Sequence, residues 1–182
     1  LFAGADIHGT TLGILGMGRV QQQFFPDSSR PEILIDLWFA EGTSFAYNEA
    51  ITHQIETRLL QEAGVESVST WVGSGLPRFY LPLDQIFPQT NVSQMILLPN
   101  SLKARETLRV ALPAMMAREF PEVRARVKLL PNGPPVAYPV QFRVVGPDPA
   151  VLRQRADEVK ALMRGNPSMR GVNDNWNEAI KV

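Results

Sequence analysis

Apolar residues recur with strand-like and helix-like spacing along most of this 182-residue chain. Between Pro31 and Phe39 they fall on every second position, which predicts a strand with one apolar face. A helix is expected to begin after Thr43 or Ser44 and to end at Gly64, because one apolar face repeats every fourth residue: Tyr47, Ile51, Ile55 and Leu59. The regular part of the chain is therefore predicted to open with a strand followed by a helix.

Four further elements continue this pattern. Strands are predicted at 65–72 and 92–98, a helix capped by Ser101 follows, and another strand is predicted at 123–129. Pro113 lies inside the second helix and is expected to kink it. The order βαββαβ is that of the split βαβ or ferredoxin-like arrangement, in which two helices cover a four-stranded antiparallel sheet. The predicted fold class is α+β.

The first half of this plan recurs near the C-terminus. A strand is predicted at 140–144, Asp148 and Pro149 can begin a helix, and Gly165 can end it before an extended stretch. Segments 32–72 and 140–180 thus share one strand–helix–strand plan, about 108 residues apart. The second copy is incomplete and would leave an unpaired sheet edge, so we expect the chain to be an excerpt of a longer protein.

Composition argues against several classes of function. Lysine plus arginine equals aspartate plus glutamate at 18 each, so the broad positive field of a nucleic-acid-binding protein is absent. The chain has no cysteine, and neither His8 nor His53 has a second histidine at metal-binding spacing. We therefore predict no metal site, no cofactor and no catalytic residue of these types.

The N-terminal segment has a separate character. Residues 11–20 are apolar but fall far short of the roughly 20 residues that span a membrane. Residues 1–25 are expected to lie outside the fold, as the remnant of a membrane helix or a segment added by cloning.

Short motifs occur in an order that is typical of one transporter family. Phe25-Pro26 precedes the first strand, and a Gly42-Thr43 turn follows it. Later stretches in the same order are 65–75 (VESVSTWVGSG), 120–127 (FPEVRARV), 133–148 (GPPVAYPVQFRVVGPD) and 171–175. Across residues 12–182 this set resembles the second large periplasmic loop of resistance-nodulation-division (RND) efflux transporters, in their multidrug branch, the acriflavin resistance protein family.

This resemblance implies a complete porter subdomain at 26–138 and the first half of a second one at 139–182. It also implies a periplasmic loop of a bacterial inner-membrane protein that exports apolar or amphipathic compounds, such as drugs, at the expense of a proton gradient. The full-length transporter would be a homotrimer working with a periplasmic adaptor and an outer-membrane channel. The family's proton-relay residues lie in its membrane helices, so the resemblance implies that this segment selects and conveys cargo and is not an enzyme.

The long loop at 73–90 is the most informative candidate site. From its residues alone, we would expect its apolar side chains to plug the open end of the sheet. The resemblance favours a switch loop between two drug pockets instead, shaped by Gly73, Gly75, Pro77 and Arg78. Predicted cargo contacts, in this loop and in a cleft between the two subdomains, are Trp71, Leu76, Phe79, Tyr80, Val140, Phe142, Asn173 and Asn175.

Simpler interpretations stay open for several residues. Phe142 suits a core position nearly as well as a cleft, and Asn173 and Asn175 suit a turn. The row of Arg124, Arg126 and Lys128 is most simply a solvated sheet face. Two other functions are also considered: a metal-exporting relative, and a stand-alone ferredoxin-like enzyme such as an acyl-phosphate hydrolase. The enzyme would need a phosphate-binding arginine after the first strand, and residues 39–44 contain none.

Overall fold

The computed structural model of the chain describes residues 2–7, 28–133, 138 and 140–176. These residues belong to two separate units, which we describe individually. The large unit comprises residues 28–133, and the small unit comprises 2–7, 138 and 140–176. The predicted boundaries at 25/26 and 138/139 fall at or beside residues outside the described part, so they stay predictions.

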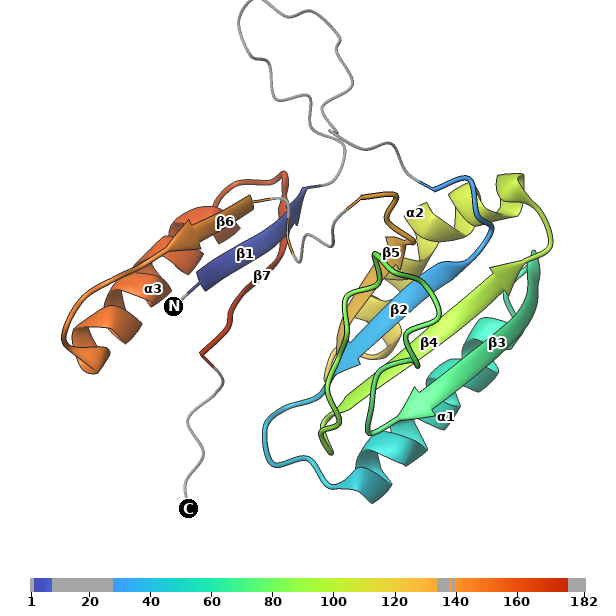
Figure 1. Cartoon of the computed structure of the whole chain (residues 1–182), viewed down its shortest axis with the longest axis horizontal. Coiled ribbons are helices and arrows are strands. Elements are labelled where there is room, and N and C mark those ends of the chain that lie inside the picture. Colours follow the sequence, from blue (N-terminus) through green and yellow to red (C-terminus); the bar gives the residue numbers. More distant parts are fainter. Residues whose placement is uncertain (1, 8–27, 134–137, 139, 177–182) are drawn as a thin grey trace, which may run out of the picture. The chain divides into compact units, whose positions relative to one another are not determined.

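The large unit has six elements in the order β-α-β-β-α-β (Figure 1). They are β2 (Ile33–Trp38), α1 (Phe45–Leu60), β3 (Val65–Val72), β4 (Val92–Pro99), α2 (Leu102–Glu119) and β5 (Arg124–Leu129). The sheet order is β3-β4-β2-β5, and each neighbouring pair is antiparallel. Both helices cover the same face of this sheet. The predicted order of elements is confirmed.

Local sequence signals explain where the helices begin and end. The Ser44 hydroxyl accepts a hydrogen bond from Tyr47 N, and the Ser101 hydroxyl accepts one from Ala104 N. Each serine therefore satisfies one of the amides that a helix N-terminus leaves free. After α1, Gly64 adopts a φ of 93°, a conformation that L side chains rarely adopt, and this turn leads into β3.

The core of the large unit lies between the sheet and its helices. Ile33, Ile35 and Leu37 of β2 are fully buried there, together with the helix residues Ile55, Leu59, Leu108, Leu112, Met115 and Met116. Complete burial of such a side chain stabilises the fold by roughly 1.5–3 kcal/mol. The prediction for the face of α1 is wrong at its first position, because Tyr47 is 50% exposed.

Polar residues take the place of Tyr47 on the buried face of α1. Asn48 and Thr52 are both fully buried. The Asn48 amide donates to Thr90 O (2.8 Å) and Val92 O (2.9 Å), and its oxygen accepts from the hydroxyl of Ser93 (2.6 Å). The first turns of α1 therefore cover backbone carbonyls at the start of β4 that need hydrogen-bond donors, and an apolar ring would leave them unsatisfied.

The small unit contains a second strand–helix–strand segment. It consists of β6 (Val140–Arg143), α3 (Pro149–Arg164) and β7 (Met169–Asp174), and the Asp148 carboxylate accepts from Ala150 N and Val151 N at the start of α3. A further strand, β1 (Phe2–Ile7), lies between β6 and β7 and is antiparallel to both. The elements predicted at 140–144 and after Asp148 are confirmed.

β1 corrects the expectation for the N-terminal segment. Residues 2–7 were expected outside the fold, but they pair with β6 (Ala3 with Phe142) and β7 (Ala3 with Asp174). The crossover through α3 leaves room for one strand between β6 and β7. An extended segment in that position forms hydrogen bonds with the backbone groups on the facing edges of both strands. Residues 8–25 of the predicted segment lie outside the described residues. No helix in the described part of the chain is both long enough and apolar enough to span a membrane.

Candidate functional site

The 73–90 loop packs against the face of the large sheet that the helices leave uncovered (Figure 1). Leu76 and Leu83 are 4% and 3% exposed and contact Leu34 and Leu130. Trp71 of β3 and Tyr80 of the loop lie half-buried against this cluster. The structure therefore brings three of the predicted contact residues, Trp71, Leu76 and Tyr80, into one apolar cluster beneath the loop.

Two glycines form the neck of the loop. Gly73 has a φ of 72°, and a Cβ there would lie 2.8 Å from Cε2 of Phe45. At Gly75 a Cβ would lie 2.8 Å from the carbonyl oxygen of Ile86, which accepts a hydrogen bond from Gly75 N (3.2 Å). At Gly75 the chain passes so close to the returning part of the loop that a side chain would require a shift of the backbone, whereas at Gly73 the Phe45 ring would have to move and the positive φ disfavours an L side chain.

The outer part of the loop presents apolar side chains to the surface. Pro77 and Arg78 are exposed, and the Arg78 guanidinium donates to Leu81 O (2.6 Å). Phe79 is 48% exposed, Leu81 80% and Phe87 69%. We call these three residues the apolar rim. Leu81 and Phe87 were not predicted as contact residues, although the apolar character of this mostly uncharged loop was the signal that could have found them.

A cation outside the loop holds two of its rings. Arg30 places its guanidinium carbon 5.8 Å from the ring centre of Phe79 and 5.5 Å from that of Tyr80, within the range of cation–π attraction. The Arg30 guanidinium also donates to the carboxylate of Glu32 (2.5 Å), and this hydrogen bond lowers the pKa of Glu32. The Arg30 carbonyl in turn accepts from Arg105 of α2 (2.6 Å). Sequence reasoning missed Arg30, because no pattern links residues so far apart.

A buried polar chain runs beneath the loop. Asp36 of β2 and Gln94 of β4 are each 1% exposed, and Gln94 Nε2 donates to Asp36 Oδ1 (2.5 Å). Lys128 of β5 forms an ion pair with Asp36 Oδ2 (2.5 Å), and Gln94 Oε1 accepts from Leu76 N (2.8 Å). Two of the basic residues of β5 that were predicted to face solvent therefore contact other side chains. Lys128 forms the ion pair with Asp36, and the guanidinium carbon of Arg124 lies 4.5 Å from the ring centre of Trp38.

The remaining predicted residues belong to the small unit. Val140 is half-buried against Met163 of α3, and Phe142 is 49% exposed. Asn173 lies within β7, where its side chain donates to Gly171 O (2.6 Å), so the expectation of a turn is wrong at this position; Asn175 is exposed beyond the end of β7. The structure thus places these four residues in a unit separate from the loop, and their role in contacting cargo stays a prediction.

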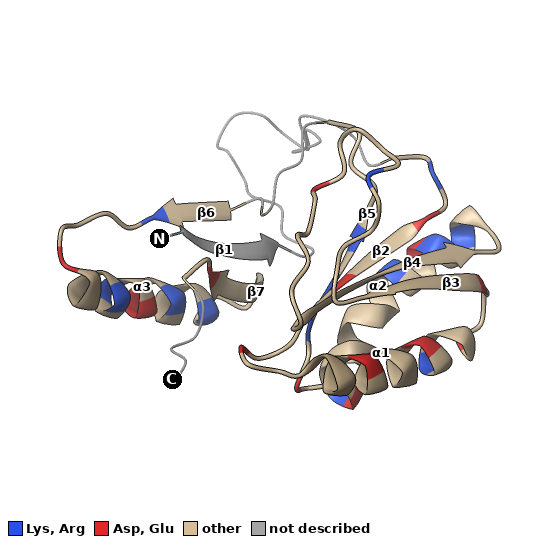
Figure 2. Ribbon diagram, turned by 60° about the horizontal axis from the view of Figure 1, so that its bottom comes forward, with Lys and Arg blue, Asp and Glu red and all other residues tan. Residues whose placement is uncertain are grey.

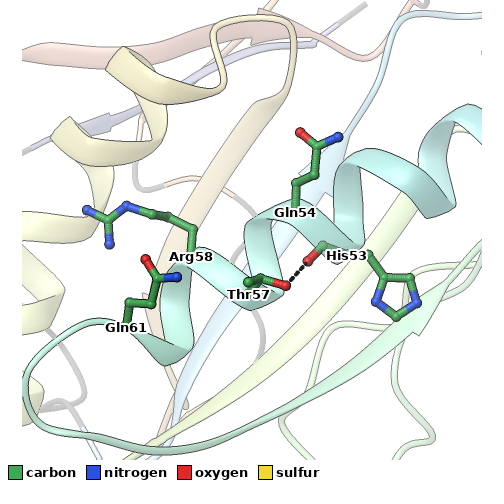
Figure 3. A pocket seen from close by; sticks show the side chains of 5 residues that line it. All are labelled: His53, Gln54, Thr57, Arg58 and Gln61. Atoms are coloured by element: carbon green, nitrogen blue, oxygen red, sulfur yellow. Dashed lines mark hydrogen bonds between the residues drawn. The ribbon is translucent and has the colours of Figure 1, made fainter.

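A depression on the outer side of α1 lies away from the loop. It measures about 390 Å³, is shallow and open, and is lined by His53, Gln54, Thr57, Arg58 and Gln61 (Figure 3). α1 covers the sheet face opposite the loop, so this depression does not coincide with the predicted site. Positions of basic and acidic residues recur along α1 and α3 (Figure 2). No group of three or more histidine, cysteine, aspartate or glutamate residues within the described part of the chain could hold a metal ion.

Comparison with known proteins identifies a similar fold. No protein-family model and no curated protein matches the sequence. A solved structure of a heavy metal efflux pump superimposes with a TM-score of 0.53 at 17% sequence identity. The superposition covers 78% of this chain and 16% of the pump chain, so the present chain spans only a small part of that protein's length. The mixed α+β fold of this chain is therefore similar to the fold of one segment of that pump.

Proposed function

We propose that this chain is a cargo-contacting porter segment of an RND-type efflux transporter, built from ferredoxin-like subdomains, and that it catalyses no reaction. The observation that carries the proposal is the apolar rim: Phe79, Leu81 and Phe87 stay exposed on a loop whose neck and inner face are fixed. The likeness of the fold to a segment of an efflux pump supports it.

The rim suits apolar or amphipathic cargo of varied shape. Aromatic and leucine side chains make large contacts that depend little on direction, so they accept many ligands. Burying the exposed parts of the three side chains is worth roughly 3–5 kcal/mol. Such a free energy corresponds to dissociation constants of roughly 0.2–6 mM. We therefore expect weak binding by this chain, with further contacts to cargo supplied by Val140, Phe142, Asn173 and Asn175.

The wider setting of the segment is also a proposal. We place it in the periplasm, as part of a proton-driven multidrug exporter of the inner membrane that assembles as a homotrimer with an adaptor and an outer-membrane channel. The ordered motifs between Gly42 and Asn175 support this setting. In such a transporter, Phe79→Ala combined with Phe142→Ala should change the range of exported compounds without lowering expression. Unchanged resistance to every compound would count against both residues.

Metal export is a second candidate. The observation in its favour is that the similar solved structure is a heavy metal efflux pump. Against it stands a sequence with no cysteine and two histidines. Calorimetric titration with zinc and copper would decide: micromolar binding of either ion by a chain without affinity for dyes would favour metal export.

Dye binding tests the proposed cargo directly. An uncharged naphthylamine dye, whose fluorescence rises in apolar surroundings, is titrated with the 182-residue chain. Phe79→Ala with Phe87→Ala should weaken binding by roughly 30-fold, because each truncation removes about 1 kcal/mol of buried apolar contact. The matched control is Leu60→Ala with Val110→Ala, which removes exposed apolar side chains from α1 and α2. Equal effects of the two double variants would reject the rim as the binding surface.

A further inference from the structure

Three adjacent strands carry hydrogen-bonded polar side chains on the sheet face under the 73–90 loop, beside an apolar cluster. Asp36 of β2 pairs in register with Gln94 of β4. Lys128 of β5 pairs with Leu34, which lies on the same face of β2 as Asp36 and two residues before it. The neighbouring side chains on this face include Leu34, Ile96 and Leu130. Polar groups in such a position need hydrogen-bond partners, because burying them unpaired costs free energy.

The hydrogen bonds of this chain can run in only one direction. The Asp36 carboxylate is an acceptor, so Gln94 must turn its amide nitrogen toward it, and Lys128 supplies the other donor. The amide oxygen of Gln94 then points away from Asp36 and needs a donor of its own. Leu76 N provides this donor at 2.8 Å. Asp36 and Lys128 therefore decide which group of Gln94 faces the loop.

We infer that Gln94 is the residue that positions the 73–90 loop over the sheet, with its orientation set by Asp36 and Lys128. The bond from Leu76 N joins the inner face of the loop to the centre of the sheet. Lifting the loop would leave both Leu76 N and Gln94 Oε1 without a partner, so the bond resists displacement. Phe79 follows Leu76 by three residues, and its position depends on this anchor together with Arg30. The consequence for cargo rests on the proposed function, whereas the positioning role does not.

Hydrogen exchange of the Leu76 amide, resolved by NMR in the 182-residue chain, measures this role. Gln94→Leu keeps a side chain of similar size but removes the acceptor. Exchange at Leu76 should then accelerate by roughly 10-fold or more, the factor expected for loss of a buried hydrogen bond. Backbone amides of α2 should keep their wild-type rates, which shows that the fold is intact. An unchanged rate at Leu76 would overturn the inference.

A charge swap separates hydrogen-bond direction from simple packing. Gln94→Glu places two carboxylates against each other and should also accelerate exchange at Leu76. Adding Asp36→Asn restores a donor at position 36 and leaves a carboxylate oxygen facing Leu76 N, so the double variant should return to within about 3-fold of the wild-type rate. Double and single variants that exchange equally fast would contradict the inference. This pair decides the question even if Gln94→Leu fails to fold.

Dye titration of the same variants keeps the two proposals apart. If the Leu76 amide responds as expected while the wild-type chain binds no naphthylamine dye, the positioning role stands and the proposed function fails. If the wild-type chain binds dye while the exchange rate at Leu76 is the same in every Gln94 variant as in wild type, the positioning role fails and the proposed function stands.

Discussion

Replacing Lys128 with methionine should destabilise the large unit strongly. The substitution keeps the apolar stem and removes the ammonium group that pairs with Asp36, a residue only 1% exposed. Removing one partner of a buried ion pair typically costs about 3–5 kcal/mol, because the other charge stays buried without compensation. The Lys128 side chain is 18% exposed, so in the variant water can reach Asp36 and partly replace the ammonium group. The lower end of this range of free energies therefore applies. We expect a loss of about 3 kcal/mol in the free energy of unfolding.

Urea denaturation provides the assay. Trp38 and Trp71 report on the large unit by fluorescence once Trp176 of the small unit is replaced by phenylalanine. For a unit of about 100 residues, 3 kcal/mol lowers the urea midpoint by about 2 M. Lys103→Met is the matched control: it makes the same chemical change at an exposed position of α2 and should cost less than about 0.5 kcal/mol. Equal midpoints for the two variants would refute the reasoning, since Asp36 would then need no cation.

Three further predictions concern the neck, the core and the outer anchor of the loop. Gly75→Ala should lower the free energy of unfolding in urea by about 1–3 kcal/mol, because the new Cβ would lie 2.8 Å from Ile86 O. An unshifted urea midpoint would show that the backbone at the neck can move at no cost. Leu37→Ala should cost about 2–5 kcal/mol, as expected for a fully buried leucine, and a cost below 1 kcal/mol would disprove its place in the core. The hydrogen bond from Arg30 lowers the pKa of Glu32 below the usual value of 4.5, so this stabilisation is complete above pH 4.5 and is lost as the pH falls through the folded pKa. The difference in urea midpoint between wild type and Glu32→Gln should therefore shrink in acid, and a difference that is constant from pH 7 to pH 3 would contradict the assignment.

Most of the fold could be predicted, because its signals are local. Every second residue of β2 and of β5 packs into the core between the sheet and the helices, and α2 buries the apolar set that its spacing indicated. The other face of β2 is buried as well, which the alternation did not indicate. The capping residues Ser44, Ser101 and Asp148 lie where helices begin. Such features depend on neighbours within a few residues, so the sequence displays them directly.

Features that depend on distant contacts could not be predicted. Asn48 replaces Tyr47 in the interior because of carbonyls 42 and 44 residues further along the chain. Arg30 meets Phe79 across a similarly large separation. The candidate site was recognised as a loop, but its anchors were missed for the same reason: a single glutamine in an apolar strand gives no sign of its partner.

Residue-resolved binding is the most direct test of a cargo-contacting loop. In a titration of the isotope-labelled chain with the naphthylamine dye, followed by NMR, each backbone amide reports whether the dye binds near it. The account predicts that the largest shifts fall within residues 76–88, around Phe79, Leu81 and Phe87. Shifts confined to the depression at His53 and Gln61, or saturating dye binding without any shift at 76–88, would contradict it.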